Sequence, residues 1–256
     1  MTEASHASLL CSGDPDPVDL VNAQSSAPIF LLCEHAGRAI PASLKNLGLD
    51  EPTLRSHRGW DIGAEALARA LADRLNAPLI LQRYSRLVID ANRPPRSAES
   101  ILHESDGVLI AANSNLSPRE VKARVEAIFD PMETAIKAAF AKHPRKATFS
   151  IHSFTPVLGG KHRPWNAGFL TRKCMPVATS IIASLHRQMP HLTLAINEPY
   201  RIDDETDWFI PHHAEARGLP HCLIEVRNDQ IVDETGVSLW ADLLGHALEE
   251  FMKELK

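Results

Sequence analysis

Four short apolar runs of this chain end in, or contain, polar side chains that can bind a metal or transfer a proton. With the apolar run in parentheses, these side chains are Glu34 and His35 (29–33), Asp90 (87–90), His152 (147–151) and Glu225 (222–226). Because ligand sites in α/β sheets lie beyond the carboxyl ends of the strands, we expect these groups to lie together. Four such placements in one chain favour an active site over coincidence.

The residue types in this set are suited to metal-assisted hydrolysis. Two histidines and a carboxylate can hold a zinc ion and leave one position open for water. A further carboxylate that does not bind the metal can take the proton from that water. Asn92 and Arg93 follow Asp90, and an arginine fork pairs with a carboxylate through two hydrogen bonds. The sequence therefore predicts hydrolysis of an amide in a small substrate that carries a carboxylate. A serine hydrolase is disfavoured, because the chain has no GxSxG motif.

Apolar runs alternate with helical patterns, which predicts an α/β sandwich of three layers around a mixed, mostly parallel sheet. Residues 1–26 are rich in Ser, Asp and Pro and are interpreted as an N-terminal arm, and residues 27–256 as a single domain. The expected strands are 29–33, 78–82, 87–90, 147–152, 192–196 and 222–226. The expected helices are 61–75, 118–142 with a kink or break at Pro131, 176–188 and 237–255.

Composition excludes several classes of partner. The 256 residues include 27 Lys and Arg against 32 Asp and Glu, a net charge of −5, so there is no positive surplus to bind nucleic acid. No apolar run approaches the roughly 18–20 residues of a membrane helix. The first residues lack the basic start and apolar run of a signal peptide, so we expect a cytoplasmic protein. The four cysteines form no CxxC pair, and the oligomeric state is left open.

Seven sequence motifs between residues 33 and 229 resemble those of the N-formylglutamate amidohydrolase family, which is related to zinc carboxypeptidases and aspartoacylases. In chain order they are CEHAGRAIP (33–41), HRGWDIGA (57–64), YSRLVIDANRPP (84–95), SIHSFTP (150–156), RPWNAGFL (163–170), NEPY (197–200) and LIEVRND (223–229).

The resemblance implies a zinc-dependent amidohydrolase with a phosphorylase/hydrolase-like, zinc-peptidase-like fold. It implies that N-formyl-L-glutamate is cleaved to formate and glutamate, a reaction of histidine degradation. By motif, His35 and His152 would bind the metal and Glu225 would be the general base. Asn92 and Arg93 resemble the pair that receives a substrate carboxylate in carboxypeptidases. Arg86 is a further candidate for substrate binding.

The third metal ligand is the point at which this chain departs from the related carboxypeptidases. They carry a glutamate three positions after the first histidine, where this chain has Arg38. Asp61 is our choice of ligand, although it can instead be the N-cap of the helix that follows. Glu34 is the alternative, although neighbours on a strand point in opposite directions unless the backbone turns.

Two other residues have competing interpretations. Glu225, in an apolar strand, is either catalytic or paired with Arg227, because an unpaired buried carboxylate is costly. Asp90 is expected to pair with Arg86 or Arg93.

Two other functions of the protein also remain open. One is a deacylase or carboxypeptidase-like hydrolase of another acyl-amino acid or peptide. The other is a non-catalytic ligand-binding homologue, suggested by the missing glutamate at position 38.

Overall fold

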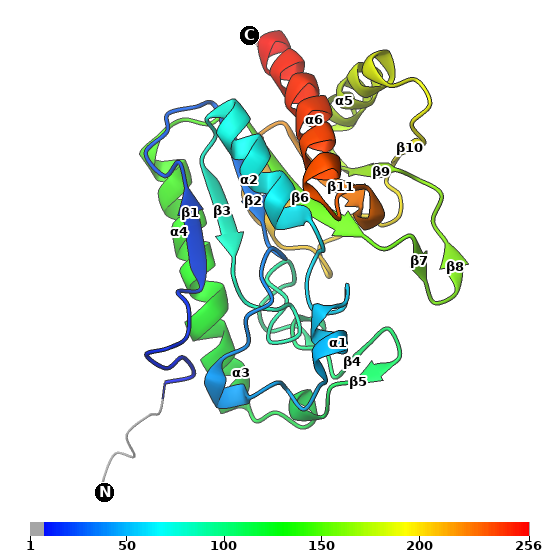
Figure 1. Ribbon diagram of the computed structural model, residues 1–256. Coiled ribbons are helices and arrows are strands. Elements are labelled where there is room, and N and C mark those ends of the chain that lie inside the picture. The colour runs from blue at the N-terminus through cyan, green and yellow to red at the C-terminus, as the bar shows by residue number, and fades with distance from the viewer. Residues whose placement is uncertain (1–7, 256) are drawn as a thin grey trace, which may run out of the picture.

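A seven-stranded mixed sheet forms the centre of the structure, a computed structural model in which residues 8–255 are described (Figure 1). The strand order is β1-β3-β2-β6-β11-β9-β10. The pairs β3–β2, β2–β6, β6–β11 and β9–β10 are parallel, and β1–β3 and β11–β9 are antiparallel, which confirms the predicted mixed, mostly parallel sheet. The strands are β1 (Val18–Val21), β2 (Ile29–Cys33), β3 (Leu79–Gln82), β6 (Ala147–Phe154), β9 (Ala167–Leu170), β10 (Leu194–Ile196) and β11 (His221–Arg227).

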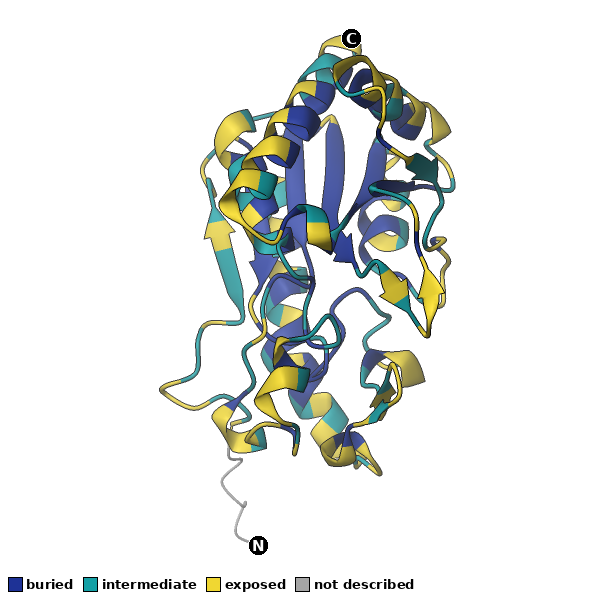
Figure 2. Cartoon of the chain, turned by 45° about the vertical axis from the view of Figure 1, so that its right-hand side comes forward, coloured by how far each residue is buried: buried dark blue, intermediate teal, exposed yellow. Residues whose placement is uncertain are grey.

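Helices cover both faces of this sheet and complete the three layers. Leu31 and Cys33 of β2 face a cluster that includes α2, α5 and α6, whereas Phe30 and Leu32 face the side covered by α4. This alternation follows from the two-residue period of a strand. In Figure 2 the central strands of the sheet are dark blue, which marks them as buried, and helices lie over them. The helices are α1 (Glu51–Arg55), α2 (Ala64–Leu75), α3 (Pro118–Arg124), α4 (Asp130–Lys142), α5 (Met175–Gln188) and α6 (Glu234–Glu254).

Below the carboxyl ends of the central strands, long connections fold into a lower region with its own apolar cluster (Figure 1). The predicted strand at 87–90 is wrong: these residues form a turn, in which Val88 N donates to Ser85 O at 2.9 Å. The apolar side chains of this run are buried against Ile128 and Phe129 instead of in the sheet. Two hairpins rim this region, β4 (Glu104–Ser105) with β5 (Val108–Leu109), and β7 (Val157–Leu158) with β8 (Lys161–His162).

The predicted helix 118–142 is continuous but not regular. Ser117 caps it with the reciprocal hydrogen bonds of a capping box to Glu120. A π-helical turn over 125–129 separates α3 from α4, so that Pro131 falls in the first turn of α4. Because proline has no N–H, it cannot continue the regular pattern, and the irregular π-helical turn directly precedes it, ending with Asp130 N–H on Val125 O.

Two strands of the sheet were not predicted. β1 lies within the predicted arm and pairs with β3 as an edge strand, whereas the first seven residues of that arm lie outside the described part of the chain. β9 has four residues, including Gly168, and is too short to show a period. Between residues 8 and 255, no helix has the length and apolar character needed to cross a membrane.

Candidate metal centre and active site

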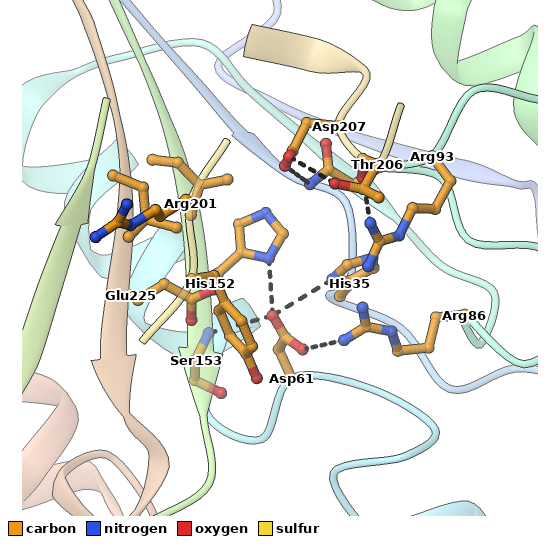
Figure 3. Close-up of a pocket in the computed structure, with 14 residues that line it drawn as sticks. His35, Asp61, Arg86, Arg93, His152, Ser153, Arg201, Thr206, Asp207 and Glu225 are labelled. Carbon is orange, nitrogen blue, oxygen red and sulfur yellow. Dashed lines mark hydrogen bonds and ion pairs between the residues drawn. The ribbon is translucent and has the colours of Figure 1, made fainter. Parts of the chain in front are cut away.

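The carboxyl ends of β2 and β6 and the loop before α2 bring together three side chains that can bind a metal (Figure 3). His35 follows β2, His152 lies within β6, and Asp61 precedes α2. One possible ligand atom from each lies within 4.8 Å of the others, and all three residues are buried. The structure thus brings together the three residues that the sequence predicts as metal ligands.

A buried carboxylate fixes the orientation of each imidazole. His35 Nε2 donates to Asp90 Oδ1 at 2.7 Å, and His152 Nε2 donates to Glu34 Oε2 at 3.0 Å. Both Nδ1 atoms consequently face Asp61 Oδ2, at 3.5 Å from His35 and 2.9 Å from His152. Carboxylates that pair with metal-binding histidines in this way fix the tautomer and increase the basicity of the ligand nitrogen.

The electrostatics of this centre suit a divalent cation. Burial alone lowers the pKa of the His152 imidazole, but Glu34 and Asp61 raise that pKa well above its ordinary value. The pKa of His35 is also raised, because its carboxylate partners outweigh burial and Arg86. Negative charge is therefore in excess when both imidazoles are neutral, and a divalent cation can replace their protons. His35 Nδ1 is buried without a hydrogen-bond partner among the described residues, which leaves it available as a ligand.

Glu225 lies beside this centre, opposite His152 in the parallel register of β11 and β6. The residue is 5% exposed, and its Oε2 has no hydrogen-bond partner within the described chain. Burial raises the pKa of Glu225 to about 7, although His152 acts to lower it. Arg227 instead donates to Asp229 at 2.8 Å, so the alternative of a Glu225–Arg227 salt bridge is wrong. The site therefore contains a carboxyl group that can exchange a proton near neutral pH.

The alternative of Asp61 as a helix cap is wrong as well. The N-cap of α2 is Gly63, and the helix begins at Ala64. The carboxylate of Asp61 instead accepts from the backbone N–H of Ser153 at 3.2 Å and from Arg86 at 3.1 Å. Burial raises the pKa of Asp61, but His35 and His152 outweigh it and keep that pKa far below its ordinary value.

Neither the alternative ligand Glu34 nor Arg38, which replaces the glutamate of the related carboxypeptidases, faces the converging atoms. Glu34 contacts His152 through Nε2, on the far side of the ring from Nδ1, and also accepts from Ser150 Oγ at 2.5 Å. Arg38 is exposed and lies over the ring of Trp60, with its guanidinium carbon 5.6 Å from the ring centroid. Asp61 is therefore the carboxylate that faces both Nδ1 atoms.

The three residues predicted to bind substrate line the same cavity of about 250 Å³ as the metal-binding set. Arg86 bridges Asp61 at 3.1 Å and Asp90 at 3.0 Å, which confirms the predicted pairing of Asp90. Asn92 donates its amide to Asp207 Oδ1 at 3.2 Å. Arg93 donates one N–H to the carbonyl of Thr206 at 2.5 Å and lies 3.8 Å from Asp90. A wider cavity of about 610 Å³ adjoins this one.

Sequence reasoning missed the segment that closes the cavity on the side of β10. It contributes the lining residues Arg201, Thr206 and Asp207. The segment has no regular secondary structure and no periodic pattern, and its position is set by contacts with residues 92 and 93, which lie far away in the sequence. The only available signal was the NEPY motif (197–200), which ends immediately before Arg201.

Comparison with known proteins identifies the family of this chain. The family model for N-formylglutamate amidohydrolase matches residues 27–232. The crystal structure of gene product Atu2144 from Agrobacterium tumefaciens is 34% identical, with a TM-score of 0.88, over 95% of this chain and 99% of that one. A bacteriophage poly-gamma-glutamate hydrolase is 10% identical (TM-score 0.46, 93% and 90% covered). A metallo-carboxypeptidase from Burkholderia cenocepacia is 15% identical (TM-score 0.43, 89% and 57% covered). A comparison with curated proteins gives no match. On the family match and the Agrobacterium relative, the chain belongs to the N-formylglutamate amidohydrolase family and is an amidohydrolase.

Proposed function

We propose that this amidohydrolase is zinc-dependent and cleaves N-formyl-L-glutamate to formate and L-glutamate. The observation that carries the proposal is the buried set of His35, Asp61 and His152 beside the unpartnered carboxyl of Glu225. Two imidazole nitrogens and one carboxylate are a common ligand set of hydrolytic zinc. A zinc ion held by these residues would polarise the formyl carbonyl and make a water molecule more acidic.

Glu225 moves the proton in the proposed reaction. It takes a proton from the attacking water as the water oxygen forms a bond to the formyl carbon. It then gives that proton to the amide nitrogen as the C–N bond breaks, which releases formate and the amino group of glutamate. Without a metal the pKa of Glu225 is about 7, and a zinc ion beside it would lower that pKa. The carboxylate would then be ionised at neutral pH, as a general base must be to take the proton from water.

The cavity supports a small anionic substrate. Its volume of about 250 Å³ accommodates an acyl-amino acid rather than a protein segment. Arg93 donates one N–H to the carbonyl of Thr206, and its remaining N–H groups can donate to a carboxylate of the substrate. We assign the α-carboxylate of the substrate to Arg93, with Asn92 and Arg86 beside it.

The test is to incubate zinc-loaded protein with N-formyl-L-glutamate and to measure formate and free amine together. We expect equal amounts of both products. The Glu225→Gln variant should keep its zinc but lose about 10²–10⁴-fold in kcat. Glu99→Gln, at an exposed position outside the cavity, is the matched control.

Each other outcome contradicts part of the proposal. Full activity of Glu225→Gln would remove the proton-transfer role. Release of another acyl group, with no formate from N-formyl-L-glutamate, would identify a different deacylase. Zinc-loaded protein that binds N-acyl amino acids without cleaving any of them would be a non-catalytic homologue.

A further inference from the structure

Three arginines line the cavity, and two of them have polar partners within the described chain. Arg86 is held between two aspartates, and Arg93 contacts Asp90 and the carbonyl of Thr206. Arg201 is exposed, and across residues 8–255 its guanidinium has no hydrogen-bond or ion-pair partner. A cation that lines a ligand cavity without a protein partner is free to bind an anion.

The backbone that presents Arg201 is held on both sides. The hydroxyl of Tyr200 accepts from Arg163 at 2.9 Å, and the Arg163 guanidinium lies 4.9 Å from the centroid of the Tyr200 ring. Ile202 is 7% exposed and belongs to the apolar cluster that contains Leu170 and Leu223. The backbone on either side of Arg201 is thus already held, so only its side chain has to be ordered around a ligand, which limits the entropy lost on binding.

Arg201 and Arg93 lie on opposite sides of the metal-binding residues. Figure 3 shows Arg201 on one side of His152, with Arg93 and Arg86 on the other side. A ligand placed over the metal centre therefore has a cationic group toward each end of the cavity. A substrate with a single carboxylate uses one of these groups, whereas a dicarboxylate can use both.

We propose that Arg201 determines specificity by binding the second carboxylate of a dicarboxylic N-acyl amino acid. This assignment rests on the proposed function, in which Arg93 takes the α-carboxylate next to the reacting amide. Arg201, at the exposed end of the cavity, then takes the side-chain carboxylate. Arginine suits this role because its planar fork can bind a carboxylate with two parallel hydrogen bonds.

The test compares N-formyl-L-glutamate with its isostere N-formyl-L-glutamine, which replaces the side-chain carboxylate by an amide. We expect the wild-type ratio of kcat/KM values to favour the glutamate compound by at least about tenfold. In Arg201→Gln we expect this ratio to approach one, mainly through KM, and in Arg201→Lys to be intermediate. Arg96→Gln, which changes an exposed arginine outside the cavity, should keep the wild-type ratio.

A wild-type ratio near one, or a ratio that Arg201→Gln leaves unchanged, would overturn the assignment. If the wild-type protein releases formate from neither compound, the proposed function fails, and the assignment is tested by calorimetry with glutarate and its monoamide. Glutarate should then bind the wild-type protein at least about tenfold more tightly than the monoamide, and Arg201→Gln should abolish the difference. Equal binding of the two ligands by the wild-type protein would overturn it.

Discussion

The hydrogen bond of 2.7 Å from His35 Nε2 to Asp90 Oδ1 determines which nitrogen of His35 faces the other metal-binding residues. With Nε2 protonated and bound, Nδ1 is the free nitrogen, and it lies 3.5 Å from Asp61 Oδ2. The other oxygen of Asp90 pairs with Arg86 at 3.0 Å. Asp90 therefore links a histidine that we propose as a metal ligand to an arginine that lines the cavity.

Replacing Asp90 should weaken metal binding without removing a ligand. In Asp90→Asn the side chain can still accept a hydrogen bond, but it has no charge to hold Arg86 and to increase the basicity of His35. We expect zinc affinity, measured by competition with a chromophoric chelator, to fall about 10–100-fold. The exposed substitution Asp73→Asn serves as the control. An affinity equal to that of the wild-type protein would show that Asp90 does not position His35.

The buried carboxyl of Glu225 should make the metal-free protein less stable as the pH rises. Its folded pKa of about 7 lies above the ordinary value of 4.5. The contribution of this group to stability is therefore fully present below pH 4.5 and is lost as the pH rises through about 7. At about 1.4 kcal/mol per pKa unit, this amounts to a loss of up to about 3 kcal/mol.

Urea unfolding of the metal-free protein checks this expectation. Between about pH 5 and pH 8, the free energy of unfolding of the wild-type protein should fall more than that of Glu225→Gln, which cannot titrate at this position. The variant should be the more stable of the two at about pH 8. The same pH dependence in both proteins would contradict the assignment of this titration to Glu225.

Gly168 should be required for the close approach of the segment that carries Arg201. This residue lies opposite Glu225 in the β11–β9 register, and a Cβ at position 168 would lie 1.7 Å from the carbonyl oxygen of Glu198. Gly168→Ala must therefore displace this segment. We expect a loss of about 1–3 kcal/mol in the free energy of unfolding and an increased KM for N-formyl-L-glutamate.

Gly13→Ala provides the comparison, because a Cβ at position 13 would meet no atom within 4 Å. If Gly168→Ala unfolds at the same urea concentration as Gly13→Ala and has the wild-type KM, the packing of this segment does not position the substrate-binding residues.

The parts of the fold that sequence could predict are those with a strong local pattern. β2, β6 and β11 are apolar runs, and α2 repeats Leu67 and Leu71 with alanines at helical spacing. The run at 87–90 has the local pattern of a strand although it forms a turn, because burial in a loop cluster gives the same pattern as burial in a sheet. β9 is not predictable from its four residues, because it is defined by its pairing with β11, which lies far away in the sequence.

The candidate site also has parts that a local sequence pattern predicts and parts that it does not. His35, His152 and Glu225 were identified because each one is a polar residue at or near the end of an apolar strand, or within one. The pairing of Glu34 with His152 and of Asp90 with His35 depends on how the strands are juxtaposed, and no local pattern encodes it. Arg201 lies in an irregular loop, where a single charged residue usually indicates only solvent exposure.

The most direct test of the metal centre is the zinc content of untagged protein, measured by plasma mass spectrometry. We predict about one zinc per chain in the wild-type protein and in the control His191→Ala, which changes an exposed histidine outside the cavity. His152→Ala should lose most of its zinc while keeping its helical circular dichroism. Wild-type protein that takes up no zinc when it is offered, or a His152→Ala variant with the full wild-type content, would contradict the proposal that His35, Asp61 and His152 hold the metal.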